Sequence, residues 1–300
     1  MDTTPMDTTN AQTHSAPSTG RKPATTRSLI ADARYEVIPL KNLEGQLEHI
    51  PTGSSVSVTC SAAKGQQVTL DLTRRILDLG YMAVPHFSAR LTEDEQKVRE
   101  LAAFCRDNGI KEMFLVGGDP EVPAGKYDGA VAFLRDFLGC DHGLQRIGVT
   151  SYPDGHALIP AAVVHEALHA KQALLKEAGV PGFASTQMHF DVPAWKKWAA
   201  GERAAGFELP LHIGVPGVID RAKLFTMGMR LGIGSSMRYV QKNRGVLGKF
   251  LKPGGYDPMK LLTPLGKVAD ELNIEGVHLF TFNNIKDTAD WQRKMLARLS

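Results

Sequence analysis

Short apolar runs alternate with longer amphipathic stretches along most of the chain. The short runs are rich in Val, Ile, Phe and Tyr and are bounded by polar or turn-forming residues, which is typical of buried strands. The stretches 92–108 and 161–178 have helical spacing, and each is followed by a glycine of the kind that ends a helix. The predicted strands are 35–38, 56–60, 82–86, 113–116, 147–150, 184–188, 209–213 and 277–282.

This alternation predicts the fold class. Eight strands separated by helices within residues 35–300 have the number and rhythm of an α/β fold, the (β/α)8 TIM barrel. Residues 1–28 differ, because they are rich in Thr, Ser and Pro and contain no aromatic residue. Such a segment buries too little apolar surface to offset the entropy of ordering it. We therefore predict a flexible N-terminal tail over 1–28 and one catalytic barrel domain over 29–300.

Composition and charge exclude some classes of binding partner for this protein. The 300 residues are 43% hydrophobic and 22% charged, as in an ordinary globular protein. The 35 Lys and Arg exceed the 32 Asp and Glu by 3 and form no basic block, so nucleic acid is not an expected partner. The longest apolar stretch, 157–164, is too short to span a membrane. Cys60, Cys105 and Cys140 form no CxxC pair, which favours a reducing, cytoplasmic location.

Polar side chains gather at or just beyond the C-terminal ends of the predicted strands. In a barrel these ends face one side, where the loops that follow the strands build the active site. We therefore expect these side chains to share a site. They are Glu36, Thr59, Ser61, His86, Asp119, Tyr152, His156, Gln187 and Asp191.

A separate motif indicates metal chemistry. His165-Glu166-Ala167-Leu168-His169 fits HExxH, in which two histidines on one helical face bind Zn²⁺ and the glutamate acts as a base. No third ligand is evident in the sequence, because the next carboxylate, Glu177, lies two turns further along the same predicted helix. A zinc hydrolase is therefore an alternative function from another class, and no metal site is expected.

Seven segments along the chain carry a family resemblance. Residues 35–39 read Tyr-Glu-Val-Ile-Pro, residues 152–156 read Tyr-Pro-Asp-Gly-His, and residues 185–191 read Ser-Thr-Gln-Met-His-Phe-Asp. In order and spacing they resemble the F-E-F-x-P, Y-P-E-x-H and x-T-Q-x-x-F-D motifs of the methylenetetrahydrofolate reductase family. The resemblance runs from about residue 34 to the C-terminus. The other matching segments are Val-Ser-Val-Thr at 56–59, Val-Pro-His at 84–86, Gly-Gly-Asp-Pro at 117–120 and Val-His-Leu-Phe-Thr-Phe-Asn at 277–283.

The resemblance implies a flavin-dependent oxidoreductase of one-carbon metabolism and methionine biosynthesis. In the family, FAD is reduced by NADH or NADPH and passes a hydride to 5,10-methylenetetrahydrofolate, giving 5-methyltetrahydrofolate. The ring of the folate must first open by protonation at N10. Glu36 is implied as the acid, and its apolar neighbours Tyr35 and Val37 favour a protonated carboxyl. The structural alternative is an ion pair of Glu36 with Arg34 or Lys41.

The remaining site residues follow from the same resemblance. Asp119 is implied as catalytic, because it contacts the pterin and tunes the flavin, although it could instead cap a helix near 123–128. Gln187, Asp119, His189 and Arg221 are implied as substrate-binding. The implied cofactor-binding residues are Thr59, His86, Gly118, Asp119, Tyr152, His156 and Lys171.

The chain departs from the family pattern in ways that leave alternatives open. Gly117 stands where the family has an arginine before Gly-Asp, which removes a cation from the flavin site. A barrel that uses the nicotinamide hydride directly, without flavin, is therefore the nearest alternative. The physiological direction and the choice between NADH and NADPH are not set by the sequence. A homo-oligomer is expected, and the folate is the expected small-molecule partner.

Overall fold

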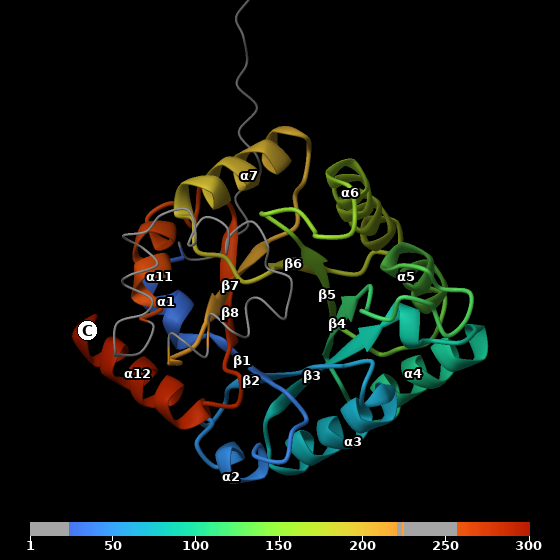
Figure 1. The fold of residues 1–300 in the computed structure, drawn as a ribbon, viewed down its shortest axis with the longest axis horizontal. Coiled ribbons are helices and arrows are strands. Elements are labelled where there is room, and N and C mark those ends of the chain that lie inside the picture. The colour runs from blue at the N-terminus through green and yellow to red at the C-terminus, as the bar shows by residue number, and fades with distance from the viewer. Residues whose placement is uncertain (1–23, 221–223, 225–256) are drawn as a thin grey trace, which may run out of the picture.

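Eight parallel strands form a closed barrel in chain order, from β1 to β8 (Figure 1). The structure is a computed structural model, and it describes residues 24–220, 224 and 257–300. β1 pairs with both β2 and β8, which closes the ring. The chain is therefore a (β/α)8 TIM barrel, as predicted. The strands are β1 (Arg34–Val37), β2 (Ser55–Val58), β3 (Met82–Ser88), β4 (Glu112–Val116), β5 (Arg146–Ser151), β6 (Gly182–Thr186), β7 (Leu211–Pro216) and β8 (Ile274–Phe280).

Helices surround the ring of strands (Figure 1). None of the helices in the described ranges is both long enough and apolar enough to cross a membrane. The helices are α1 (Thr26–Ala31), α2 (Glu44–Leu47), α3 (Gly65–Asp78), the short 3₁₀ helix η1 (Ala89–Leu91), α4 (Glu95–Asp107), α5 (Ala130–Leu138), α6 (Ala161–Glu177), α7 (Val192–Ala204), α11 (Met259–Gly266) and α12 (Ile285–Arg298).

The ends of the elements follow local signals that the sequence carries. α4 begins after Asp94, whose carboxylate accepts a hydrogen bond from the Lys97 amide. Gly109 and Gly179, which follow α4 and α6, have positive φ angles of 64° and 67°, as expected for residues that end helices. Each of the eight predicted strands overlaps an observed one, with ends displaced by a few residues because the neighbouring strand decides where pairing stops.

The N-terminal boundary differs from the prediction. Residues 24–28 fall within the predicted tail, yet they lead into and begin α1. Thr25 and Ser28 form a reciprocal capping box, and Leu29 and Ile30 are buried against the core. A prediction from composition overlooked this local signal.

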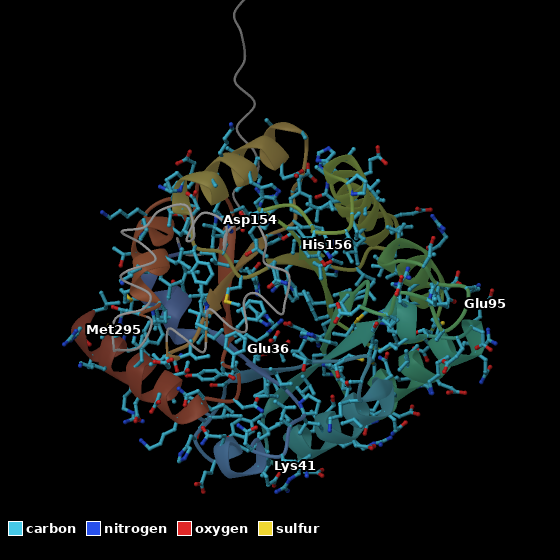
Figure 2. All side chains as sticks on the ribbon, viewed as in Figure 1. Glu36, Lys41, Glu95, Asp154, His156 and Met295 are labelled. Carbon is cyan, nitrogen blue, oxygen red and sulfur yellow. The ribbon has the colours of Figure 1, made fainter. Side chains whose placement is uncertain are left out.

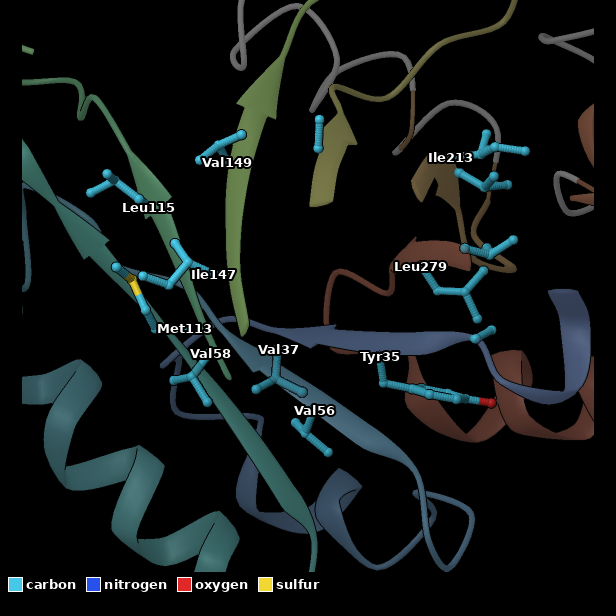
Figure 3. Packing of buried hydrophobic residues seen from close by; sticks show 14 of the residues in the cluster. Tyr35, Val37, Val56, Val58, Met113, Leu115, Ile147, Val149, Ile213 and Leu279 are labelled. Atoms are coloured by element: carbon cyan, nitrogen blue, oxygen red, sulfur yellow. The ribbon is translucent and has the colours of Figure 1, made fainter. Parts of the chain in front are cut away.

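The outward faces of the strands carry the main hydrophobic core. Tyr35, Val37, Val56 and Val58 alternate with inward residues on the first two strands and pack under the helices (Figure 3). The Tyr35 hydroxyl donates a 2.7 Å hydrogen bond to Gln292 of α12, which ties the first strand to the last helix. This layer fixes the positions of the strands, and hence the residues at their ends.

Inside the barrel, unlike in the hydrophobic layer under the helices, aromatic rings and charged pairs fill the space. Phe114 and Phe183 form a small apolar cluster with Val84, and Gly148 is required beside them, since an added Cβ would lie 2.3 Å from the Phe183 ring. Below them, the N-terminal ends of the strands bring together two ion pairs, Arg34 with Glu112 and Arg146 with Glu275. These side chains fill the N-terminal end of the barrel, so the C-terminal end is the one available for a ligand.

Candidate active site

Glu36 occupies the inward position of β1. Its neighbours Tyr35 and Val37 point outward, and strand alternation therefore turns the carboxylate toward the barrel axis. Glu36 is 8% exposed, and its Oε2 lies 2.8 Å from Nε2 of His278 on β8. Figure 2 shows Glu36 among the strands, whereas Lys41 lies at the periphery. The hydrogen-bond partner of Glu36 is thus His278, and the alternative ion pairs with Arg34 and Lys41 are wrong.

His86 lies beside this pair on β3. Its Nε2 is 2.6 Å from the Ser57 hydroxyl, and its ring lies 4.9 Å from that of Phe114 and 6.1 Å from that of His278. Burial, followed by the nearby His278 and Arg34, lowers the pKa of His86 well below 6.5, so the ring is neutral at physiological pH. One ligating atom each from Glu36, His86 and His278 lie within 4.8 Å of one another, a spacing that would also admit a metal ion.

Arg90 organises the loop that carries Gly118 and Asp119. Its guanidinium donates hydrogen bonds to three carbonyls of the loop between β4 and α5, those of Pro120, Glu121 and Asp128, at 2.6–2.8 Å. Its own amide donates to the Gly117 carbonyl at 2.9 Å. The loop is therefore held in one conformation by a residue of η1, the short helix that follows β3.

Gly118 is the point of closest approach between this loop and β3. Its φ is +98°, and an added Cβ would lie 2.0 Å from the Ser88 hydroxyl. Only glycine meets both conditions without strain. The absence of a side chain at Gly118 therefore lets the backbone that follows β4 pack against Ser88 at the end of β3.

Asp119 is exposed and faces the residues at the end of β5. Burial lowers the pKa of His156, and the charge of Asp119 opposes that shift. Burial raises the pKa of Tyr152, and Asp119 adds to the rise. The two rings are 5.2 Å apart in an edge-to-face contact. Asp119 does not cap α5, which begins at Ala130 after Gly129, so the expected alternative role at 123–128 is wrong.

Gln187 and His189 follow β6. The Gln187 side-chain oxygen accepts a 2.8 Å hydrogen bond from the Met188 backbone N–H, and the Gln187 backbone N–H donates to the Ser151 carbonyl of β5 at 2.9 Å. His189 is buried, and its Nδ1 lies 2.9 Å from the Asp154 carboxylate. His189 therefore joins the loop after β6 to the loop after β5, where Figure 2 shows Asp154 and His156.

Lys171 projects from α6 toward β5 and is buried. Its Nζ donates to the Thr150 carbonyl at 2.9 Å and to the Thr150 hydroxyl at 3.4 Å. Burial lowers the pKa of Lys171 to about 8. The ammonium therefore lies on the helix side of β5, outside the barrel, and both of its hydrogen-bond partners belong to Thr150 of that strand.

We expect Lys171 to make the stability of the protein depend on alkaline pH. Its pKa is about 8 when folded and 10.5 as its ordinary value, so the unfolded chain binds the extra proton between these limits. The contribution of Lys171 to the free energy of unfolding therefore increases as the pH rises from about 8 to 10.5. Urea unfolding across this range should show that increase relative to Lys171→Met. Lys176→Met, which alters an exposed lysine of the same helix, should keep the wild-type dependence.

Three buried hydroxyls at strand ends lack hydrogen-bond partners within the described part of the chain. They are Thr59 Oγ1 after β2, Ser88 Oγ on β3 and Ser151 Oγ on β5. Buried hydroxyls are normally satisfied, and an unpartnered one indicates a missing ligand or water. The C-terminal face thus presents three buried hydroxyls that are available to a polar ligand.

The structure brings most of the predicted site residues to one face. Arg221 is outside the described residues. Sequence reasoning missed the roles of His278, Ser57 and Arg90. The signal for His278 was present, since it lies within the resembling segment 277–283. Ser57 likewise lies within the resembling segment 56–59, whereas Arg90 lies in none of the seven segments and its partners are distant in the sequence.

The two histidines of the HExxH motif lie on the outside of the barrel. His165 and His169 project from α6 toward Glu202 of α7, and Glu166 is exposed. Glu202 thus joins the two histidines as a third possible metal ligand, which the sequence alone did not reveal. The pair is therefore separate from the polar face at the strand ends.

No known family model matches the chain. Among solved structures, the HPPK-DHPS of Plasmodium falciparum with pteroate shares 9% identity at a TM-score of 0.47, covering 91% of this chain and 49% of that one. The chain thus spans about half of that protein. A sugar phosphate isomerase/epimerase from Parabacteroides distasonis shares 11% identity at a TM-score of 0.38, covering 89% and 94%. A D-hydantoinase from Bacillus sp. AR9 shares 11% identity at a TM-score of 0.42, covering 82% and 56%. These likenesses are at the level of the fold.

Proposed function

We propose that this barrel is an oxidoreductase that interconverts 5,10-methylenetetrahydrofolate and 5-methyltetrahydrofolate with NADH or NADPH, using FAD. The observation that carries the proposal is the Glu36–His278 pair at the barrel axis, beneath the strand ends that bear the resembling segments. Pairing a buried carboxyl with an imidazole provides a proton donor inside a water-poor site. Gln187 and Asp119 lie in loops of the same face and supply an amide and a carboxylate for a pterin.

FAD fits the polar groups of this face. Thr59, with its unpartnered hydroxyl, and Gly118, where the backbone makes its closest approach, are two groups that would hold it. When bound, FAD supplies hydride transfer between the nicotinamide and the folate. The other residues proposed to hold it are His86, Asp119, Tyr152 and His156. Lys171, which the resemblance also implies, donates to Thr150 from behind β5 and could act on the cofactor only through that strand.

The protein's own task in this reaction is the movement of one proton. Ring opening of the folate requires a proton at N10, and Glu36 can donate it only when its carboxyl is protonated. If His278 is protonated, its Nε2, 2.8 Å from Oε2, returns a proton to the spent carboxylate and leaves a neutral imidazole. Neutral His86 adds no positive charge that would hold Glu36 in its ionised form. His189 and Arg221 are proposed to bind the folate together with Gln187 and Asp119.

The proposal is tested by an absorbance spectrum of the purified full-length chain. We expect visible flavin bands from non-covalent FAD, bleached by NADH or NADPH and restored by 5,10-methylenetetrahydrofolate. A colourless protein that takes up no FAD but still reduces the folate would replace this mechanism with direct hydride transfer from the nicotinamide. A colourless protein without folate turnover would refute the proposed activity.

A further inference from the structure

A cluster of ligating side chains lies between α6 and α7, on the outside of the barrel. His165 and His169 are one turn apart on α6, and their ring centroids are 4.4 Å apart. Glu202 lies on α7, the helix that follows β6. The three ligating atoms, His165 Nδ1, His169 Nε2 and Glu202 Oε2, all lie within 4.8 Å of one another.

Both imidazoles converge on the same oxygen atom. His165 Nδ1 and His169 Nε2 each lie 2.9 Å from Oε2 of Glu202. A carboxylate that serves only as a hydrogen-bond acceptor has two oxygens over which to distribute its donors. The two contacts are at hydrogen-bond distance, and they also hold the three ligand atoms within 4.8 Å of one another, close enough for all three to reach one cation.

Glu202 is costly to bury without a cation. With Trp195 and Ala199 it forms the buried face of α7, and only 10% of its side chain is exposed. Within the described residues no Lys or Arg forms a salt bridge with Glu202, whose side-chain partners are the two imidazoles, although Arg203 interacts with its charge from beyond that distance. A buried carboxylate needs compensation of its charge, and a cation held by the same three side chains would supply it.

A hollow adjoins the cluster and leaves room for a further ligand. Its volume is about 380 Å³, and its lining includes His165, Glu202, Trp198, Lys197 and Pro153. Two ligands of the cluster thus face open space, while His169 closes the inner side against the Phe207 ring, 5.7 Å away. An ion held here would have three protein ligands and one open position.

We propose that His165, His169 and Glu202 form a binding site for a divalent transition metal, of which Zn²⁺ fits best. Two imidazole nitrogens and one carboxylate oxygen are a ligand set suited to Zn²⁺, whereas Mg²⁺ and Ca²⁺ prefer oxygen ligands alone. Water or a small anion from the hollow completes the coordination. The site joins α6 to α7 and does not depend on the proposed folate chemistry.

The test is metal binding by the chelator-stripped, full-length protein. We expect one equivalent of Zn²⁺ to bind in competition with a chromophoric chelator, more weakly at acidic pH because protons compete for the imidazoles. Co²⁺ in its place should give the visible absorption of a tetrahedral N/O site. Glu202→Gln and His169→Ala should each weaken Zn²⁺ binding by about 100-fold or more, since even outer partners of a metal site contribute about 10–100-fold.

Matched variants separate this site from other sources of binding. His49→Ala removes a histidine elsewhere in the chain and should leave Zn²⁺ affinity unchanged. His165→Ala alters a side chain that is 46% exposed, so it keeps the test valid if the more buried variants fail to fold. If Zn²⁺ binding survives in both His165→Ala and Glu202→Gln, the proposal is overturned. Loss of binding in His278→Ala alone would place the ion in the barrel and would overturn it as well.

Discussion

Replacing Glu36 with Gln should slow folate turnover by about 100-fold or more while reduction of the flavin by the nicotinamide stays near normal. The amide keeps the shape of the side chain and can still pair with His278 Nε2, but it has no acidic proton to give to the folate. A loss of about 100-fold corresponds to about 2.7 kcal/mol in the barrier. Stopped-flow measurement of the two half-reactions separates the expected effects.

The control for this variant is Glu48→Gln, which changes an exposed carboxylate outside the barrel and should leave both half-reactions unchanged. Thermal unfolding of Glu36→Gln should remain close to that of the wild type, because the pair with His278 persists as a hydrogen bond. Folate turnover within about threefold of the wild type would show that Glu36 is not the acid. Equal loss in both half-reactions would assign Glu36 a general role in holding the site together.

Replacing Arg146 with Met should lower the free energy of unfolding by about 2–3 kcal/mol. Arg146 donates two hydrogen bonds to Glu275, at 2.6 and 2.7 Å, across the N-terminal end of the barrel. Its guanidinium also lies 4.7 Å from the centroid of the Phe183 ring. The two charged side chains are 20% and 23% exposed, so solvent screens part of the loss that a fully buried pair would show. Urea unfolding with linear extrapolation measures the difference.

Two further variants decide the cause of that loss. The double variant Arg146→Met with Glu275→Met should recover part of the stability, because apolar side chains of similar length fill the same volume without a buried charge. Arg293→Met changes an arginine that is 77% exposed and should alter stability by less than about 0.5 kcal/mol. A double variant that is less stable than Arg146→Met alone would mean that packing, and not the unpaired charge, accounts for the effect.

The fold could be predicted from the chain because its signals are local. Alternating outward residues such as Val56 and Val58, and glycines such as Gly109 at the end of α4, act within a few neighbouring residues. The same locality explains the error at the N-terminus. The tail was predicted from the average composition of residues 1–28. That average does not register the capping box at Thr25, which involves only four consecutive residues.

The predicted site residues were identifiable for a related reason. In a barrel every strand ends on the same face, so Glu36, Asp119, Tyr152, His156 and Gln187 could be assigned to one side without knowledge of their contacts. Their partners could not be assigned in this way. The choice of His278 for Glu36, across 242 positions of sequence, depends on closure of β8 against β1.

The sequence by itself determined the barrel, the face that carries the polar residues and the helix that carries the HExxH histidines. Only the tertiary structure decided that Glu202 meets His165 and His169, that Arg90 holds the loop of Asp119, and that Lys171 is buried behind β5. The physical reason is that periodicity and capping depend on neighbours along the chain. Pairing of charges depends on which helices and loops pack side by side, and that is settled only when the whole ring closes.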